Sequence, residues 1–360
     1  MTEPKIIPLL EDRSSAELDD RCGMRYWFYK HEGGTGIVPK KEALALTIGK
    51  QTHEDLARLA EMQDISLGAL QECVEELTDG LSDEDRKFTK QMELLYRRLG
   101  WFCAWGMFIE PNIRRNYEDI GIEKDIILDR GKLWIPTTPD RVLRHKHLKD
   151  NIIYQEYKST QRADSKWQQS WRFAIQLHIG LKAVEEEIGE KLKYAKVIGL
   201  MKGEERDGRL AHPYVYGYYN THNGHWSCEY KTGRDWVLMP TWEYEGGILS
   251  WVDFCGPDVA KAQFPQSAPV FLDDRMLADW VRRRTLRQRK VKIVKERARI
   301  DREWRAVHFE RRTGQCRPAY GDICPYLLPC WNATAELDPL GTGEFEPRQP
   351  HHEIELAGVE

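Results

Sequence analysis

Apolar and polar residues recur with regular spacing in several stretches, and each spacing predicts a type of secondary structure. Between positions 43 and 62 apolar residues return every three or four positions, which predicts an amphipathic helix. The stretches 133–143 and 152–160 have strand-like patterns and are joined by the charged sequence HKHLKDN, which predicts a β-hairpin. Positions 170–189 again show helical spacing, and 194–203 is a short apolar run typical of a buried strand.

A long basic helix is predicted toward the end of the chain. From Arg282 to Arg305 there are twelve Lys or Arg and three acidic residues, which gives this segment a local charge of +9. Because the net charge of the chain is −4, the rest of the chain carries a charge of −13. An apolar stripe recurs there every seven residues and is expected to face the core: Leu286, Ile293, Ile300 and Val307, widened by Val294 and Trp304. The cations, among them Arg283, Arg287 and Lys290, either contact phosphate groups or are simply solvated.

Length and composition allow one large domain with a sizeable core, because 41% of the 360 residues are hydrophobic. The expected order is a helical region at 20–98, a catalytic core at 107–203, a β-rich insertion at 204–270, and the basic helix with a cysteine loop at 271–331. The aromatic residues of the insertion either pack its sheet or stack on unpaired bases. The tail 332–360 is rich in Pro, Gly and Glu and is expected to be disordered.

The pattern of the chain excludes several locations and protein classes. No apolar run approaches the length of a membrane span, and the first residues do not have the pattern of a signal peptide, so we expect no membrane partner and a cytoplasmic location. The stretch at positions 49–52 superficially resembles the end of a P-loop, but Leu44 stands where its first glycine belongs. No G-x-S-x-G or G-x-G-x-x-G motif is present.

The predicted hairpin carries the strongest chemical signal in the chain. Pro139-Asp140 lies on its first strand and Glu156-Tyr157-Lys158 on its second. Because strand side chains alternate, Glu156 and Lys158 share a face while Tyr157 points away. Two carboxylates can hold Mg²⁺ or Mn²⁺, which prefer oxygen ligands, and the ammonium can offset developing negative charge. This combination is typical of phosphodiester hydrolysis.

Two further motifs lie in the same order as in a known family. Upstream, the segment from Gly49 to His53 resembles a GxxxH helix motif, and downstream Gln176 lies on a predicted amphipathic helix. Together with the PD and ExK residues, they resemble the PD-(D/E)xK nuclease superfamily, and within it the RecB-like exonucleases, including CRISPR-associated and phage-encoded members. The chain departs from the family pattern at Ala57, where a glutamate is common, and at Gly180, where the QxxxY motif has tyrosine.

The resemblance implies a fold, an activity and roles for these residues. The fold is α/β, a restriction-endonuclease-like mixed sheet flanked by helices. The activity is that of a Mg²⁺- or Mn²⁺-dependent DNA nuclease, more specifically an exonuclease on DNA ends or single strands. The implied roles assign the metal to His53, Asp140, Glu156 and the Tyr157 carbonyl, and catalysis to Lys158, Asp140, Glu156 and Gln176. Glu123 is a further acid behind these ligands.

The chain has eight cysteines. Because we expect a cytoplasmic location, which is reducing, these cysteines are not expected to form a disulfide framework. Cys316, Cys324 and Cys330 lie close together in a loop rich in Pro and Gly, and Cys22 precedes the predicted core. In iron-sulfur members of the family one cysteine precedes the core and three follow it, so the resemblance implies a [4Fe-4S] cluster that joins the two ends of the chain. A zinc site and free buried thiols are the alternatives.

A second function remains open from the sequence. The incomplete GxxxH and QxxxY motifs are compatible with a non-catalytic DNA-binding or assembly protein on the same scaffold. The joint presence of Asp140, Glu156 and Lys158 favours the enzyme, because DNA binding alone does not need an acidic metal pocket beside an ammonium.

Overall fold

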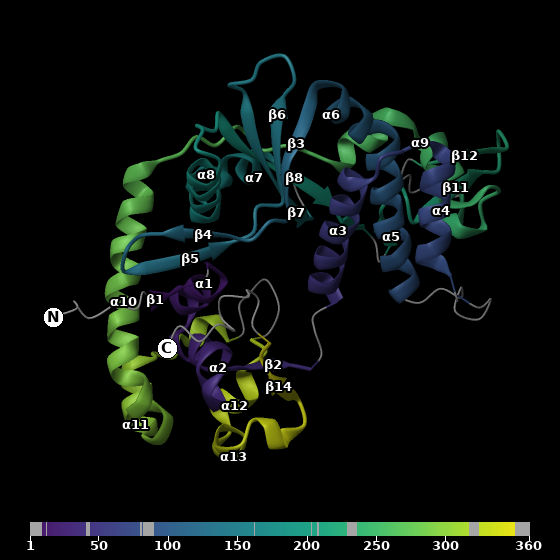
Figure 1. Ribbon diagram of the computed structural model, residues 1–360. Helices are drawn as coiled ribbons and strands as arrows, with labels where there is room; N and C mark the ends of the chain where they lie inside the picture. The colour runs from purple at the N-terminus through teal and green to yellow at the C-terminus, as the bar shows by residue number, and fades with distance from the viewer. Residues whose placement is uncertain are drawn as a thin grey trace.

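The computed structural model describes residues 9–11, 13–40, 44–79, 81, 90–161, 163–202, 204–206, 209–228, 236–316 and 324–349. The protein is mixed α/β, with several small sheets and helices on both sides of the central one (Figure 1). No helix in the described ranges is long and apolar enough to cross a membrane.

The central sheet has the order β3-β6-β7-β8. Its strands are β3 (Tyr117–Ile122), β6 (Arg141–His145), β7 (Ile152–Thr160) and β8 (Tyr194–Met201). β3, β6 and β7 pair antiparallel, whereas β8 runs parallel to β7. The first six residues of β7 are all buried, because helices cover both faces of this strand.

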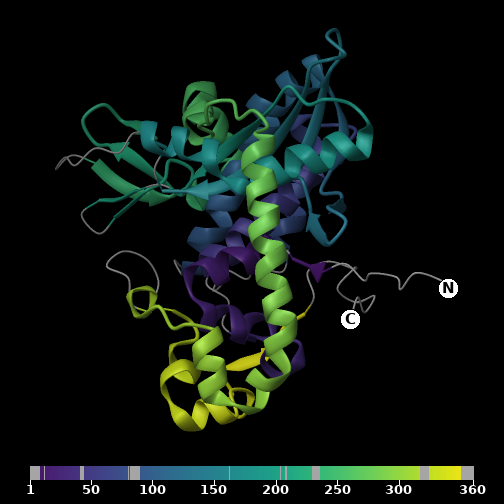
Figure 2. The same cartoon turned by 90° about the vertical axis from the view of Figure 1, so that its left-hand side faces the viewer.

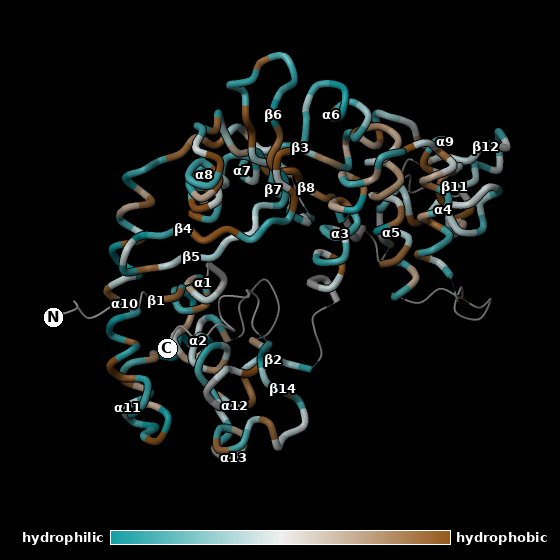
Figure 3. The backbone as a smooth tube through the Cα atoms, viewed as in Figure 1, coloured by the Kyte–Doolittle hydropathy of each residue, from teal (hydrophilic) through white to brown (hydrophobic). Residues whose placement is uncertain are grey.

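The predicted hairpin is only half correct, because the stretch 133–143 contains two strands in two different sheets. β5 (Leu133–Thr137) pairs with β4 (Ile126–Asp129) and with the short β1 (Leu9–Leu10), and only β6 pairs with β7. The chain bends between β5 and β6, where Pro139 has no N–H to donate to a ladder. Asp140 therefore lies in the bend, immediately before β6. The apolar residues of β4 are visible in Figure 3.

One face of the central sheet packs against helices from the first and last thirds of the chain. These are α3 (Leu44–Glu61), α5 (Lys90–Ala104) with its π-helical continuation η2 (Trp105–Ile109), and α9 (Gly247–Gln263). Tyr157 of β7 packs edge-to-face on Trp105, with ring centroids 5.5 Å apart. α4 (Leu67–Thr78) completes this layer, and α6 (Glu110–Asn116) leads into β3.

The other face carries α8 (Ile175–Ile188), preceded by α7 (Ser165–Ser170) and the 3-10 turn η3 (Trp171–Phe173). α8 lies very close to β7: a Cβ added at Gly180 would be 2.6 Å from the ring of Tyr154. The position where the QxxxY motif has a side chain is therefore filled by a tyrosine from the strand.

The predicted β-rich insertion is partly helical. It contains the short pair β9 (Glu204–Arg206) and β10 (Arg209–Ala211), and a sheet of β11 (Tyr216–Asn220), β12 (His225–Ser227) and β13 (Trp236–Pro240). After these strands, α9 spans positions 247–263 of the predicted insertion. Tyr219 and Trp226 pack on each other with centroids 5.0 Å apart, which is the packing role expected for such aromatics.

The two ends of the chain meet in a second hydrophobic cluster. The N-terminal part supplies α1 (Arg13–Arg21), α2 (Gly23–Lys30) and β2 (Ile37–Pro39). The C-terminal part supplies α11 (Arg302–His308), α12 (Leu327–Trp331), α13 (Ala333–Leu337) and β14 (Phe345–Pro347), which pairs with β2. The prediction of a disordered tail is therefore wrong up to Pro347, and positions 350–360 lie outside the described residues.

The long helix α10 (Asp274–Ile300) joins the central sheet to this terminal unit and runs along one side of the molecule (Figures 1 and 2). The predicted apolar stripe is wrong at its four heptad positions, since Leu286, Ile293, Ile300 and Val307 are 59–87% exposed. The two residues that widened it, Val294 and Trp304, do pack in the terminal cluster. The buried face is Leu277, Trp280, Arg284, Gln288, Val291, Val294 and Ala298. Arg284 and Gln288 interrupt the apolar pattern of the buried face. The heptad of exposed residues was therefore the more regular apolar pattern in the sequence.

The basic face of α10 is partly used inside the protein. Arg284 is buried and pairs with Glu11 and Asp19 at 2.8 and 3.1 Å. Arg287 contacts the same Asp19 at 2.6 Å and lies over the ring of Phe309. Arg287 is therefore paired inside the protein, which neither of the two alternatives for the basic face foresaw, whereas Lys290 is exposed.

Candidate metal centre

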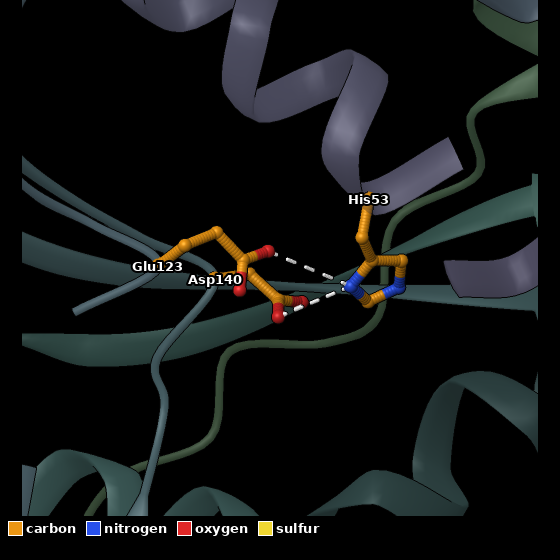
Figure 4. A group of neighbouring side chains, drawn as sticks. All are labelled: His53, Glu123 and Asp140. Carbon is orange, nitrogen blue, oxygen red and sulfur yellow. Dashed lines mark ion pairs between the residues drawn. The ribbon is translucent and has the colours of Figure 1, made fainter. Parts of the chain in front are cut away.

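A histidine and two carboxylates from three separate elements converge beside the central sheet (Figure 4). His53 Nδ1 lies 3.3 Å from Asp140 Oδ1 and 3.8 Å from Glu123 Oε1. One ligand atom from each residue can be chosen so that all three lie within 4.8 Å of one another, and in the described parts of the chain no other such group of His, Cys, Asp or Glu is found. This arrangement can hold one divalent cation.

His53 is carried by α3, whose orientation is fixed on its inner side. Leu56 and Leu59 are buried in the core, and Asp55 accepts a 2.8 Å hydrogen bond from Arg98 of α5. Thr52 is buried with its hydroxyl donating to the carbonyl of Ile48. The helix therefore presents His53 to the sheet from a rigid position.

Asp140 is placed by the bend between β5 and β6. The backbone N–H of Tyr157 donates a 2.5 Å hydrogen bond to Asp140 Oδ2, while Oδ1 faces His53. The Tyr157 side chain points away from Glu156 and Lys158, as the strand pattern predicts, and its ring packs edge-to-face on both Trp105 and His53. Its carbonyl as a metal ligand stays a prediction.

Glu123 takes a more central place than the sequence assigned to it. It follows β3 directly and has φ of 41°, the left-handed conformation that a residue other than glycine rarely adopts. This turn of the backbone brings its carboxylate toward His53. The sequence GIEKDIIL offers Glu123 and Asp125 equally, so the local alternation could not identify the acid that reaches the centre.

Glu156 lies beside this group but outside the closest trio. Its carboxylate contacts Lys158 Nζ at 2.5 Å, accepts a 3.2 Å hydrogen bond from Gln176 Nε2, and accepts a further one from the Tyr154 hydroxyl. Gln176 therefore lies beside Glu156, and its expected role of holding the lysine or a phosphate stays a prediction. Glu156 and Lys158 share one face of β7, as their spacing requires.

The charges of the group are strongly interdependent. Burial and repulsion by Asp140 raise the pKa of Glu123 to about 7, although its side chain is 34% exposed and water screens part of this effect. Burial lowers the pKa of His53, but the charge and hydrogen bond of Asp140 outweigh it and the net shift is upward. For Asp140, burial is outweighed by His53, Lys158 and the Tyr157 N–H, which lower its pKa.

A buried ion pair between Arg141 and Glu110 lies next to the candidate metal centre. Arg141, next to Asp140, is 1% exposed and contacts both oxygens of the buried Glu110, at 2.7 and 2.8 Å. It also contacts Asp119 of β3 at 2.5 Å. Arg141 therefore ties β6 to β3, the two strands that position Asp140 and Glu123.

The four predicted cluster cysteines gather in the terminal unit. Cys22 and Cys330 are buried in its hydrophobic cluster, Cys324 packs against it, and the Cys324 N–H donates to the Cys316 carbonyl at 3.0 Å. Burial raises the pKa of the Cys330 thiol to about 11, partly offset by Arg311, with smaller contributions from Cys22 and Cys316.

Four neighbouring sulfurs brought from both ends of the chain fit the ligand set of a [4Fe-4S] cluster. A closed tetrahedral zinc site needs sulfurs about 3.8 Å apart, since Zn–S is about 2.3 Å. No three thiols lie that close together among the described residues. The [4Fe-4S] cluster and the zinc site both stay predictions.

The remaining cysteines lie elsewhere. Cys73 and Cys103 are buried and Cys228 and Cys255 partly buried, and all four belong to the core beside the central sheet or pack against it. This matches their expected role as small apolar residues.

No family model matches the chain. No curated protein matches it in sequence either.

Proposed function

We propose that the protein is a divalent-metal-dependent DNA nuclease with a restriction-endonuclease-like core, acting as an exonuclease on DNA ends or single strands. The observation that carries the proposal is the convergence of His53, Glu123 and Asp140 within 4.8 Å, next to a lysine on the same strand as Glu156. The hydrogen bond from the Tyr157 N–H, between Glu156 and Lys158, to Asp140 supports the proposal, because it brings the PD and ExK residues together.

The residues divide into metal ligands and groups that act on the substrate. His53, Glu123 and Asp140 would hold Mg²⁺ or Mn²⁺, and Glu156 would join them when Lys158 turns from it to the substrate. When bound, the ion polarises a phosphoryl oxygen and lowers the pKa of a coordinated water. Lys158 orients that water and offsets the negative charge that develops on the phosphoryl group. Gln176 and Tyr154 hold Glu156 in place.

The donor set suits a hard cation that also accepts one imidazole. Carboxylate oxygens are ligands of both Mg²⁺ and Mn²⁺. The single histidine makes the site more suitable for Mn²⁺ than for Mg²⁺, because Mg²⁺ rarely accepts a nitrogen ligand. The partial exposure of Lys158 and Glu123, 27% and 34%, leaves access for a phosphate on the solvent side.

The four clustered cysteines would hold a [4Fe-4S] cluster, as the resemblance implies, with zinc as the less suitable occupant. Because the cluster would join α2 to the segment after α11, its role is structural: it restricts the unfolded chain and fixes the terminal unit against α10.

The test is degradation of end-labelled single- and double-stranded DNA with Mg²⁺ or Mn²⁺. We expect the parent to degrade DNA and Lys158→Ala to lose at least about a hundredfold in rate, because the developing charge loses its ammonium. Lys149→Ala, an exposed lysine in the turn between β6 and β7, serves as the matched control. If the parent binds DNA but degrades neither substrate, the non-catalytic DNA-binding alternative holds instead.

A further inference from the structure

An exposed aromatic side chain lies on the turn that leads into α8. Phe173, the last residue of η3, is 72% exposed. It stands three residues before Gln176, which contacts Glu156 at 3.2 Å. Three residues of extended chain span at most about 11 Å, so the Cα atom of Phe173 lies within that distance of Gln176, whose side chain contacts Glu156 beside the candidate metal centre.

The turn that carries Phe173 is held by a buried histidine. His178 is 1% exposed, and its Nε2 donates to the Arg172 carbonyl at 3.0 Å while its Nδ1 accepts from the Asp273 N–H at 3.0 Å. The Ala174 N–H also donates to the Trp171 carbonyl at 3.0 Å. These hydrogen bonds fix the backbone of the turn, which therefore keeps the Phe173 ring outside the core.

The helix before the turn is anchored over the strand that bears the catalytic lysine. A Cβ added at Gly199 would be 3.0 Å from the Trp167 ring, and Gly199 is the residue of β8 that pairs with Lys158 of β7. Trp167 also packs edge-to-face on Trp171, with centroids 5.7 Å apart. α7 and η3 are thus one aromatic unit seated beside Lys158.

A cation accompanies the exposed ring. The Arg172 guanidinium is 5.8 Å from the centroid of Phe173, and Arg172 is itself exposed. An aromatic face beside a cation matches the two parts of a nucleotide, because a base stacks on the ring and a phosphate pairs with the guanidinium. Burial against a base would also remove the apolar ring from water.

We propose that Phe173 stacks on an unpaired base of the DNA strand that enters the metal centre, with Arg172 at its phosphate, and that this contact favours the binding of single strands over duplexes. The proposal rests on the proposed function, since it takes DNA as the substrate. A base within a duplex is already stacked on both faces and does not offer itself to the ring.

The first test is DNA binding with EDTA present, which prevents hydrolysis. Fluorescence anisotropy compares a labelled single strand with a blunt duplex for the parent, Phe173→Ala and Phe173→Trp. We expect Phe173→Ala to weaken single-strand binding by about fivefold or more, with little change for the duplex, and Phe173→Trp to retain it. Equal binding by parent and Phe173→Ala would overturn the proposal.

The second test reports stacking itself. A single strand that contains 2-aminopurine loses fluorescence when the base stacks on an aromatic ring. We expect quenching by the parent and by Phe173→Trp but not by saturating Phe173→Ala. An abasic strand should bind the parent and Phe173→Ala equally. A purely structural role of Phe173 would weaken both strands alike, and that result contradicts the proposal.

The two proposals fail in different ways. If the parent degrades DNA through Lys158 and Phe173→Ala keeps the same strand preference, only the stacking assignment is wrong. If Phe173 supports single-strand binding but no Mg²⁺- or Mn²⁺-dependent degradation occurs, the nuclease proposal is wrong and the stacking assignment stands.

Discussion

At the scale of single residues, the spacing of Glu156 and Lys158 was enough to place them on one face of β7, where they contact each other at 2.5 Å. His53 was correctly grouped with Asp140 through the order of the motifs. Glu123 was given too small a role from the sequence, because its approach to His53 depends on a left-handed φ of 41°. Glutamate has no particular preference for that conformation, so no local pattern announces it.

Mn²⁺ affinity should depend on pH through Glu123 and His53. Both groups have a raised pKa in the metal-free protein, about 7 for Glu123, and both must lose a proton to bind a cation. Affinity should therefore rise between pH 6 and 8 and fall as the pH drops through 7, by up to about tenfold per pH unit for each proton released. Calorimetric titrations with Mn²⁺ at pH 6, 7 and 8 measure it.

Glu123→Gln should bind Mn²⁺ more weakly at pH 8 and show a shallower pH dependence, because it loses one ligand and one titrating group. Glu118→Gln, an exposed glutamate of β3, is the matched control and should behave as the parent does. Equal affinities of the parent at pH 6 and pH 8 would contradict the assignment of Glu123.

At the scale of elements, the types of most long segments were predictable, but the face of α10 was not. Its buried side includes Arg284 and Gln288, which are satisfied by Glu11, Asp19 and Tyr26. These partners come from the first 26 residues, so the sequence of α10 alone could not reveal that polar positions are internal. The bend at Pro139 was also missed, because β5 and β6 pair with different strands in different sheets. The sequence from Leu133 to Leu143 alone does not show which strands will be their partners.

Adjacent residues of α10 test the corrected face. Val294 is 5% exposed and Ile293 is 80% exposed. Val294→Ala should lower the free energy of unfolding by about 2 kcal/mol, since two methyl groups are lost from the terminal cluster. Ile293→Ala should change it by less than about 0.5 kcal/mol. Urea unfolding of both variants measures this, and the reverse order of effects would show that the predicted stripe was right.

At the scale of the whole molecule, the cysteines predicted that the two ends of the chain meet. β14 pairs with β2, and Cys22 shares a hydrophobic cluster with Cys330. The sequence did not predict the ordered segment after Asn332, because its strand has only three residues and carries no periodic signal. Short elements of this kind are specified by tertiary contacts and not by local pattern.

The cluster proposal predicts iron in the purified protein. Protein purified without oxygen should be brown and contain iron, and Cys330→Ala should lose most of the iron and melt at a lower temperature. Cys73→Ala is the control, because Cys73 is equally buried but lies in the other core. A colourless parent without iron would rule out the cluster, and stoichiometric zinc would identify the alternative site.

Anomalous diffraction from crystals grown with Mn²⁺ measures whether His53, Glu123 and Asp140 hold one divalent cation. We expect a peak about 2.0–2.3 Å from one ligand atom of each of the three residues. Asp140→Asn should abolish or strongly weaken this peak. A parent crystal saturated with Mn²⁺ that shows no peak between these side chains would contradict their assignment as metal ligands.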